Sequence, residues 1–474
     1  MTSAAAPHRR GRLPARLRGT TFGLVLVITL IAFEAMAVAT ALPTAVRALH
    51  GLAAYGWSFT AFLVATVVGM VTAGEGADRH GARRPLLLGL GLFAVGLVLA
   101  GAAPAMAVFV LGRAVQGLGS GLVIVAVYVV IGDLYEEELR PRVFGYLSAA
   151  WVVPALVGPV LSGLIAQHLS WRLVFLGLTP FVLAGIALLL PTLRRSPVGG
   201  HAAAGPTGLR RWPFALAVAA GIALVQYAGQ RPAWPTLLGA AGGAALLTLG
   251  LRRLLPRGTV LVRRGVPAAI AFRGMLAGSL FAVESLVPLT LTVVHGSSPA
   301  QAGAPLTVGA LGWSAAAWWQ GRHPDLPRYR LVRAGFALVG LAALGIAVVS
   351  LPGTPAWLAY PVWGTAGLGA GLTMPSASIL MLALSPPAER GANSAALQIA
   401  DAVTSSVCIG IGGVLVAAAE RGAFTLTTAA VTVDLLMAGL AAAGCALAAR
   451  GQAPEPAATA TASAVGAPAT TLVE

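Results

Sequence analysis

About fourteen separate runs of apolar residues, each long enough to cross a lipid bilayer as a helix, dominate this sequence of 474 residues. The hydrocarbon core of a bilayer is about 30 Å thick and takes about 20 apolar residues of helix, because backbone groups in lipid must satisfy their own hydrogen bonds. The predicted spans cover residues 22–46, 57–74, 86–103, 105–131, 143–166, 173–191, 213–229, 234–251, 267–294, 301–320, 332–350, 356–384, 393–419 and 424–448. The chain is therefore predicted to be an all-α, multi-pass membrane protein.

Composition supports this assignment and argues against other classes of protein. Hydrophobic residues make up 57% of the chain and charged residues 10%, far from the balance of a soluble domain. The net charge of +16 does not indicate nucleic-acid binding, because the basic residues lie in short loops between apolar runs. The first run is longer than the apolar region of a signal peptide and contains Glu34, so we interpret it as a retained helix.

The arginines predict the orientation of the chain. Twenty-five of the 31 basic residues, all of them arginine, fall in the amino-terminal tail and in loops on one side of the predicted membrane. The other side has only Arg47, Arg172, Arg231 and Arg421. By the positive-inside rule we expect both termini in the cytoplasm and the protein in the inner cell membrane. Omitting spans 213–229 and 234–251 together preserves this asymmetry, so a twelve-span protein is an alternative.

An internal repeat predicts how the spans are grouped. At a shift of about 250 residues, several features of the two halves coincide, as expected of a duplicated transporter core. The matching features are Gly117–Gly121 with Gly367–Gly371, Arg140 with Arg390, and Glu34 with Glu284; at a slightly smaller shift, Gly74 and Asp78 match Gly321 and Asp325. We predict a basic cytoplasmic tail (1–21), a six-helix bundle (22–191), a cytoplasmic linker with two extra helices (192–266), a second six-helix bundle (267–449) and a disordered cytoplasmic tail (450–474).

The segment after the second span has a characteristic pattern of glycine and charge. It places Gly74, Asp78, Arg79, Gly81, Arg83 and Arg84 in a spacing that resembles the G-x-x-x-D-R-x-G-x-R-R signature of the major facilitator superfamily. A glycine turn would let two helices approach, and Asp78 would bind arginine or a helix amino terminus and hold the cytoplasmic side closed. An ordinary positive-inside loop would explain the arginines but not their spacing.

The fourth span carries a polar face inside an apolar helix. Arg113, Gln116, Gly117 and Ser120 fall at i, i+3, i+4 and i+7, similar to the R-x-x-Q-G-x-G pattern of the same superfamily. An arginine within a span costs about 2.5–3.5 kcal/mol on insertion scales, so it should face a cavity or a carboxylate. The alternative is that Arg113 extends to the outer membrane surface.

Two further motifs narrow the resemblance. Pro154, Gly158, Pro159 and Gly163 follow the G-x-x-x-G-P-x-x-G-G motif of antiporters in this superfamily, with Pro154 and Ser162 replacing two glycines, which weakens the inference of antiport. Residues 34–43 resemble the D-x-T-V-V-x-x-A-L-P segment of the fourteen-helix drug:proton antiporter family, with Glu34 in the aspartate position. The resemblance implies two pseudo-symmetric six-helix bundles plus two inserted helices, and proton-coupled transport.

Four acids lie inside predicted spans: Glu34, Glu284, Asp401 and Asp434. Glu34 lies about 18 Å into its helix, at mid-membrane depth, and Arg113 is its expected partner. We expect Glu34, Arg113, Glu284 and Asp401 to carry proton coupling, and Glu34, Gln116, Ser120 and Glu284 to line a substrate cavity. Glu284 precedes Pro288 by one turn, where a broken helix could line that cavity. Structural, protonated acids are the alternative, chiefly for Asp434.

The predicted function is export of small lipophilic or cationic compounds, driven by the proton gradient. The alternatives are a proton symporter or uptake carrier and a transporter-like sensor. No catalytic constellation accompanies the intramembrane acids, so we do not expect an enzyme. The two cysteines and seven histidines form no metal-ligand pattern, so no cofactor or metal is predicted. The acidic run Glu136–Glu138 is either a solvated loop or a gate partner for nearby arginines. We expect a monomer in the bilayer.

Overall fold

The computed structural model describes residues 15–136, 139–195, 211–231, 234–323, 325–386 and 389–452, and within these ranges it contains helices and no strands. The first group comprises α1 (Ala15–Ala48), α2 (Tyr55–His80), α3 (Arg83–Gly101), α4 (Met106–Leu134), α5 (Arg140–His168), α6 (Arg172–Leu176) and α7 (Thr179–Arg195). Next come α8 (Trp212–Gln230) and α9 (Trp234–Leu254). The last group comprises α10 (Val266–Val293), α11 (Pro299–Gly321), α12 (Arg328–Val349), α13 (Ala359–Leu384), α14 (Arg390–Glu420) and α15 (Leu426–Leu447).

The helices have the length and composition of membrane spans. Within the described residues, 13 are long and apolar enough to cross a bilayer, and they include α8 and α9. The 23-residue helix α11 is not among the 13, since its proline, glycine and tryptophan residues lower its mean hydropathy. It nevertheless packs against α13 and α5 inside the bundle. The predicted all-α membrane fold is confirmed.

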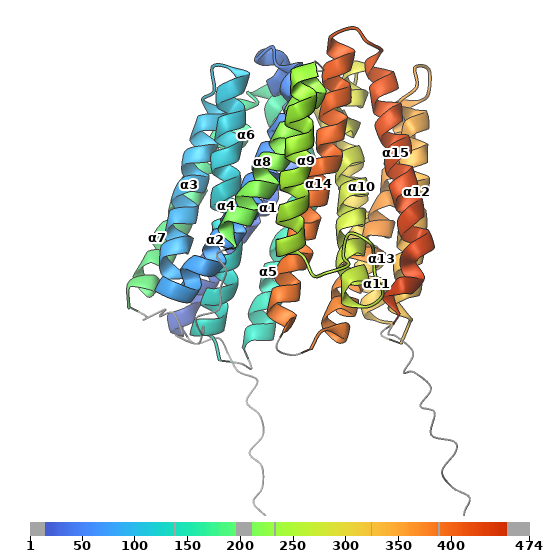
Figure 1. Cartoon of the computed structure of the whole chain (residues 1–474). Coiled ribbons are helices and arrows are strands. Elements are labelled where there is room, and N and C mark those ends of the chain that lie inside the picture. Colours follow the sequence, from blue (N-terminus) through green and yellow to red (C-terminus); the bar gives the residue numbers. More distant parts are fainter. Residues whose placement is uncertain are drawn as a thin grey trace, which may run out of the picture.

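The long helices run side by side, and the described chain begins and ends at the same end of the bundle (Figure 1). We call that end, at the bottom of the view, the tail end, and the opposite end the far end. The short 3₁₀ helices Leu52–Ala54 and Ala356–Leu358 lie at the far end, whereas Ala448–Gly451 lies at the tail end. In the first group, α1, α3 and α5 therefore run from the tail end to the far end, and the other crossings run back.

The glycine-rich repeat has the same packing role in both halves. Helix α4 packs between α2 and α3, and α13 packs between α11 and α12. A methyl group on Gly117 would collide with the carbonyl of Phe62 on α2, and one on Gly367 with the carbonyl of Gly309 on α11. Glycine is required at these positions because the backbones are in direct contact.

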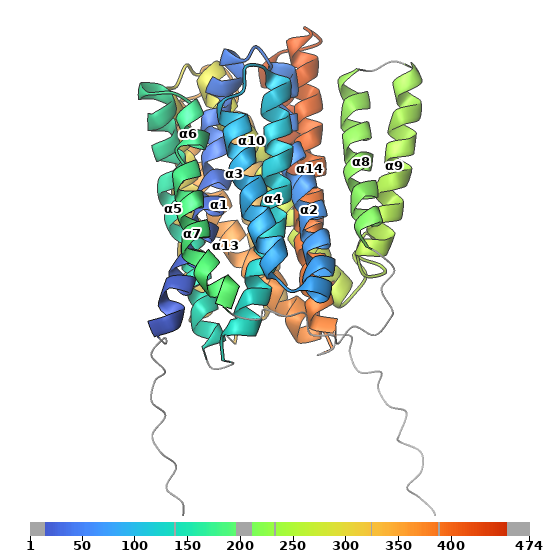
Figure 2. The same cartoon turned by 90° about the vertical axis from the view of Figure 1, so that its left-hand side faces the viewer.

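Helices α8 and α9 form a hairpin outside the two groups, beside α2 and α14 (Figure 2). Gly221 and Gly243 bring the two hairpin helices close together: a Cβ on Gly221 would lie 2.6 Å from the carbonyl oxygen of Gly243. Helix α9 packs on α8, and α8 packs on both α2 and α14. The hairpin thus meets the rest of the protein mainly through α8, and Leu254 at the end of α9 joins the same apolar contact.

The predicted sixth span is confirmed as the candidate span Arg172–Pro191, although a short break divides it into α6 and α7. Two other local expectations were wrong. Helix α2 continues to His80, so most of the predicted loop is helical and the turn is at Gly81, whose φ of +76° suits glycine. Helix α10 is unbroken through Pro288, because the loss of one backbone hydrogen bond does not end a helix packed on most sides.

Candidate functional site

Glu34 and Arg113 form an ion pair in the interior of the first helical group. Arg113 Nη1 on α4 donates to Glu34 Oε1 on α1, and the two side chains are only 2% and 1% exposed. Glu34 lies near the middle of α1, and Arg113 lies in the first third of α4. The structure therefore joins the two residues that the sequence predicted to be partners, and Arg113 does not extend to the membrane surface.

The guanidinium of Arg113 has further partners from the same helical group. Its Nε donates to the Ser58 carbonyl oxygen at 3.0 Å, and its Nη1 donates to Gln116 Oε1 at 2.9 Å. Its Cζ lies 4.4 Å from the centre of the Phe62 ring, a cation–π contact. These contacts fix the arginine, while Glu34 Oε2 is buried without a hydrogen-bond partner in the described structure.

The other residues predicted for a substrate cavity in the first group are closed off in this conformation. Gln116 and Ser120 are 0% and 1% exposed, and the amide Nε2 of Gln116 has no partner in the described structure. Their contact with a substrate is not observed and stays a prediction. Glycines on the same helix bring α2 against this face, which explains why the side chains are buried.

Glu284 occupies the equivalent position in the second group but has a different environment. It is partly exposed on α10, a helix whose other residues are mostly buried. Among the described residues it has no hydrogen-bond or ion-pair partner. The residue that corresponds to Arg113 is Trp363, which is buried and packs against Gly309. Glu284 is thus a partly exposed acid without the arginine that neutralises Glu34.

Asp401 pairs with an arginine that the sequence analysis did not assign to the site. Arg273 Nε on α10 donates to Asp401 Oδ2 on α14 at 2.8 Å, and the side chains are 19% and 18% exposed. Arg273 Nη1 lies 3.4 Å from Ser378 Oγ on α13. The sequence did contain a signal for this pair, because Arg273 lies inside the ninth predicted span and a buried arginine needs a partner. This pair is closer to the tail end than Glu34 and Glu284 are.

Asp434 is isolated from the other acids. It is 1% exposed on α15; Ser350 Oγ approaches its Oδ2 at 3.5 Å, and its Oδ1 has no partner in the described structure. The structure places it between α15 and the end of α12, within the second group. This position agrees with the structural alternative considered for it, and no role in transport follows from its contacts.

The motif after the second span is partly described. Asp78 and Arg79 lie in the last turn of α2, but their side chains are outside the described part of the structure, as are Glu137 and Glu138. Arg83 and Arg84 are exposed at the start of α3, and a Cβ on Gly74 would meet open space. The predicted gate contacts of this motif stay predictions.

The motif on α5 forms part of the contact between the two helical groups. A Cβ on Gly163 would lie 2.7 Å from Ala300 Cα on α11, and one on Gly303 would lie 2.8 Å from the Pro159 carbonyl oxygen. Gly158 instead faces Met36 on α1, and Pro154 is buried. Near the far end, the Tyr55 hydroxyl donates to the carbonyl of Ser285, next to Glu284. The groups are therefore in close contact at the far end.

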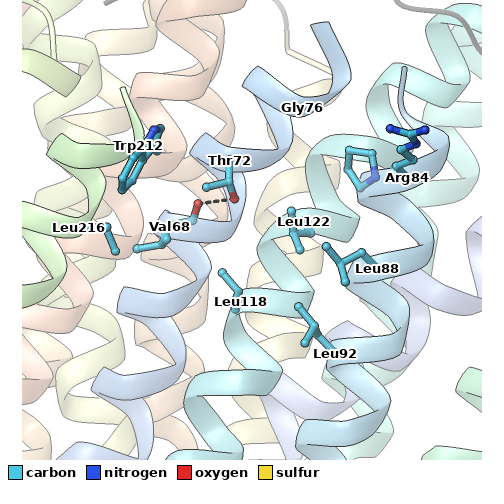
Figure 3. A pocket seen from close by; sticks show the side chains of 11 residues that line it. Val68, Thr72, Gly76, Arg84, Leu88, Leu92, Leu118, Leu122, Trp212 and Leu216 are labelled. Carbon is cyan, nitrogen blue, oxygen red and sulfur yellow. Dashed lines mark hydrogen bonds between the residues drawn. The ribbon is translucent and has the colours of Figure 1, made fainter. Parts of the chain in front are cut away.

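Two surface grooves are separate from these charged residues. One, of about 450 Å³, lies between α2, α3, α4 and α8, with Arg84 and Trp212 at its rim and leucines within it (Figure 3). The other, of about 490 Å³, lies between α1 and α5 and is lined by Arg18, Phe22 and Tyr146 among others. Neither groove is lined by any of the four intramembrane acids.

Comparison with known sequences agrees with this architecture. The family model of the Major Facilitator Superfamily matches residues 24–408. A probable multidrug-efflux transporter of Mycobacterium tuberculosis strain H37Rv is 27% identical over 445 residues, which cover 89% of this chain and 93% of the relative. Multidrug resistance protein 3 of Bacillus subtilis strain 168 is 32% identical over 161 residues, 34% of this chain and 31% of the relative.

Solved structures show the same fold. A POT family transporter in complex with 5-aminolevulinic acid matches with a TM-score of 0.67 and 16% identity, covering 92% of this chain and 97% of that one. The POT family transporter PepTSo matches with a TM-score of 0.68 and 14% identity, covering 92% and 98%. At this identity the likeness extends to the fold alone.

Proposed function

Since this chain belongs to the Major Facilitator Superfamily, we propose that it is a proton-coupled exporter of small lipophilic cations that works by alternating access. It is a transporter and not an enzyme. The observation that carries the proposal is the contrast between two glutamates at equivalent positions: Glu34 is neutralised by Arg113, whereas Glu284 is partly exposed and unpaired among the described residues.

Glu34 is the proposed proton site. Protonation would remove the carboxylate charge that holds Arg113, and the buried pair would weaken. Arg113 also holds Ser58 on α2 and Gln116 on α4, so a change at Glu34 would reach two neighbouring helices. Protonation from outside would favour substrate release, and deprotonation toward the cytoplasm would reset the protein. Asp401, paired with Arg273, is a second proposed participant in coupling.

Glu284 is the proposed contact for the cation. An unpaired carboxylate with apolar surroundings favours a ligand that combines positive charge with apolar surface, because that ligand supplies the missing charge and tolerates desolvation. Several relatives carry names that describe efflux, among them the mycobacterial relative and an efflux pump of Gibberella fujikuroi, 32% identical over 191 residues. Those names support export as the direction.

The proposed orientation follows from charge. The tail end carries most of the loop arginines, so we assign it to the cytoplasm, with both termini there and the protein a monomer in the inner cell membrane. The far end, where the two helical groups touch, then faces outward. The contact between the two groups at that end would have to open before substrate could leave outward, as alternating access requires.

Resistance profiling tests the substrate class. A strain that overexpresses the protein and a strain that lacks it are compared against lipophilic cations and against neutral and anionic compounds of similar size. We expect overexpression to protect against the cations, and Glu284→Gln to abolish that protection. Glu420→Gln, a change at an exposed acid of α14, is the matched control. Protection against anions alone would refute the assignment of cations.

Inside-out vesicles test coupling and direction. A proton gradient should drive cation uptake by the wild-type protein and the Glu420→Gln control, and the Glu34→Gln variant should retain downhill counterflow but lose the gradient-driven component. Normal pumping by Glu34→Gln would eliminate the proposed proton site. Transport in the opposite direction would establish an uptake carrier, and binding without transport of any compound would establish a sensor.

A further inference from the structure

The α8–α9 hairpin lies where the two helical groups meet on the α2 side, and it contacts both of them. Val67 of α2, three residues of α8, Leu254 of α9 and three residues of α14 form one buried apolar cluster; the α8 and α14 members are Ala215, Val218, Ile222, Ile399, Ala402 and Val403. On the opposite side of the bundle, α5 and α11 meet without an intervening helix. The hairpin is therefore placed to influence how α2 and α14 separate.

Charged residues from different groups hold the two ends of α8. At its tail end, Glu75 Oε1 of α2 accepts hydrogen bonds from the backbone N–H groups of Arg211 at 2.5 Å and Trp212 at 3.1 Å. At its far end, Arg421 Nη1, just after α14, donates to the Gln230 carbonyl oxygen at 2.5 Å. An acid at the amino terminus and an arginine at the carboxyl terminus both complement the helix dipole.

Gln230 connects the two groups by itself. Its side-chain Oε1 accepts from Trp57 Nε1 at 2.7 Å, and its Nε2 donates to the Ala53 carbonyl oxygen at 3.1 Å, both in the first group. Its backbone carbonyl is held by Arg421 of the second group. Because Glu75 also belongs to the first group, α8 has more polar bonds to the first group than to the second among the residues that the structure describes. The Arg421 bond is the one that must break when α14 moves away.

Gln226, one turn earlier on α8, differs from Gln230 in that its side chain destabilises the contact between α2 and α14. It is 3% exposed, and neither its Oε1 nor its Nε2 has a hydrogen-bond partner in the described structure. It packs where Gly56 of α2 meets Gly413 of α14, with Nε2 3.3 Å from a Cβ built on either glycine. A buried amide without partners destabilises the conformation that buries it. Separation of α2 and α14 would let water reach this amide.

We propose that α8 sets the balance between the closed and open far end: the Arg421–Gln230 bond holds it closed, and the unpartnered amide of Gln226 favours opening. The proposal rests on alternating access, which is part of the proposed function. Gln230 and Gln226 are positioning residues, since they act through the contact between α2 and α14. The hairpin moves with the first group, and only its contact with α14 is remade during the cycle.

Distance measurements on the purified full chain in nanodiscs test this proposal. Spin labels are attached at Leu169→Cys and Trp357→Cys, exposed far-end positions of the two groups that lie away from α8, after Cys408→Ala and Cys445→Ala. Arg421→Ala should increase the long-distance population relative to the short one by about fivefold, the net effect of one solvent-exposed hydrogen bond. Gln226→Leu should shift the same ratio by about fivefold in the opposite direction.

Two matched variants control for nonspecific effects. Arg47→Ala removes an exposed arginine at the same end of the bundle, and Gln167→Leu removes an exposed glutamine there. In the described structure α8 packs on α2, α9 and α14 and not on α1 or α5, which carry these residues, so both variants should leave the distances unchanged. If two distance populations exist but Arg421→Ala and Gln226→Leu leave their ratio unchanged, or shift it in the same direction, the role of α8 is refuted. If one population alone appears in every variant and at every substrate concentration, alternating access itself is refuted.

Discussion

The two helical groups share a backbone plan but differ in chemistry at equivalent places. In the first, Glu34, Arg113 and Gln116 form a buried polar cluster, and Arg113 lies over Phe62. In the second, Glu284 has Trp363 and Ala366 at the matching positions, and Trp363 packs against Gly309.

In the first group an arginine packs over a phenylalanine, and in the second group a tryptophan packs against a glycine. The two pairs fill the same space, but only the first carries a positive charge. The two groups therefore share helix packing, while Glu34 is neutralised and Glu284 has no partner among the described residues. Substitutions at the shared packing residues should change the stability of both groups alike, whereas substitutions at the acids should not.

The largest effect should come from the buried pair of the first group. Arg113→Met leaves Glu34 buried without its counter-charge and should lower the free energy of unfolding by about 3–5 kcal/mol. Thermal unfolding of the purified protein measures the loss. The double variant Glu34→Gln with Arg113→Met should recover most of the stability, because no charge is then left unpaired. Equal stability of Arg113→Met and wild type would show that the pair is not formed.

The glycine contacts should come next, and they should be equal in the two groups. Gly117→Ala and Gly367→Ala each place a methyl group against a backbone carbonyl of the adjacent helix and should cost about 1–3 kcal/mol. Gly91→Ala on α3, where a Cβ meets open space, is the control and should be neutral or slightly stabilising. A loss in one group alone would contradict the shared packing plan.

The partly exposed pair of the second group should matter less. Asp401→Asn removes an ion pair whose side chains are 19% and 18% exposed, and partial solvation limits its worth to about 1 kcal/mol. The same thermal measurement should also show a dependence on salt concentration for this pair and none for Glu34 with Arg113. A loss as large as that of Arg113→Met would mean that the pair is closed off from water.

Glu284→Gln should have the smallest effect on stability. The carboxylate has no partner to lose among the described residues, so the free energy of unfolding should change by about 0.5 kcal/mol or less. Transport of cations should nevertheless fail, as described above. Strong destabilisation by Glu284→Gln would reveal a structural partner and would remove the contrast between the two groups.

Some contacts were beyond the reach of sequence patterns. Arg113 as the partner of Glu34 could be predicted, because an arginine in lipid requires a carboxylate and few were available. The pairing of Arg273 with Asp401 depends on how α10 and α14 face each other, which no local pattern specifies. The roles of Glu75 and Gln230 depend on where the inserted hairpin docks, and polar residues near helix ends are too common to indicate a docking site.

The sequence by itself determined the membrane fold, since about fourteen apolar runs can satisfy their backbone only as helices in lipid. It also determined the duplicated packing, because glycines at fixed spacing specify close helix contacts. Only the tertiary structure decided which acid is neutralised, that Gln116 and Ser120 are closed off, and that α8 bridges α2 and α14. Those outcomes depend on the relative rotation and docking of helices, which long-range packing sets.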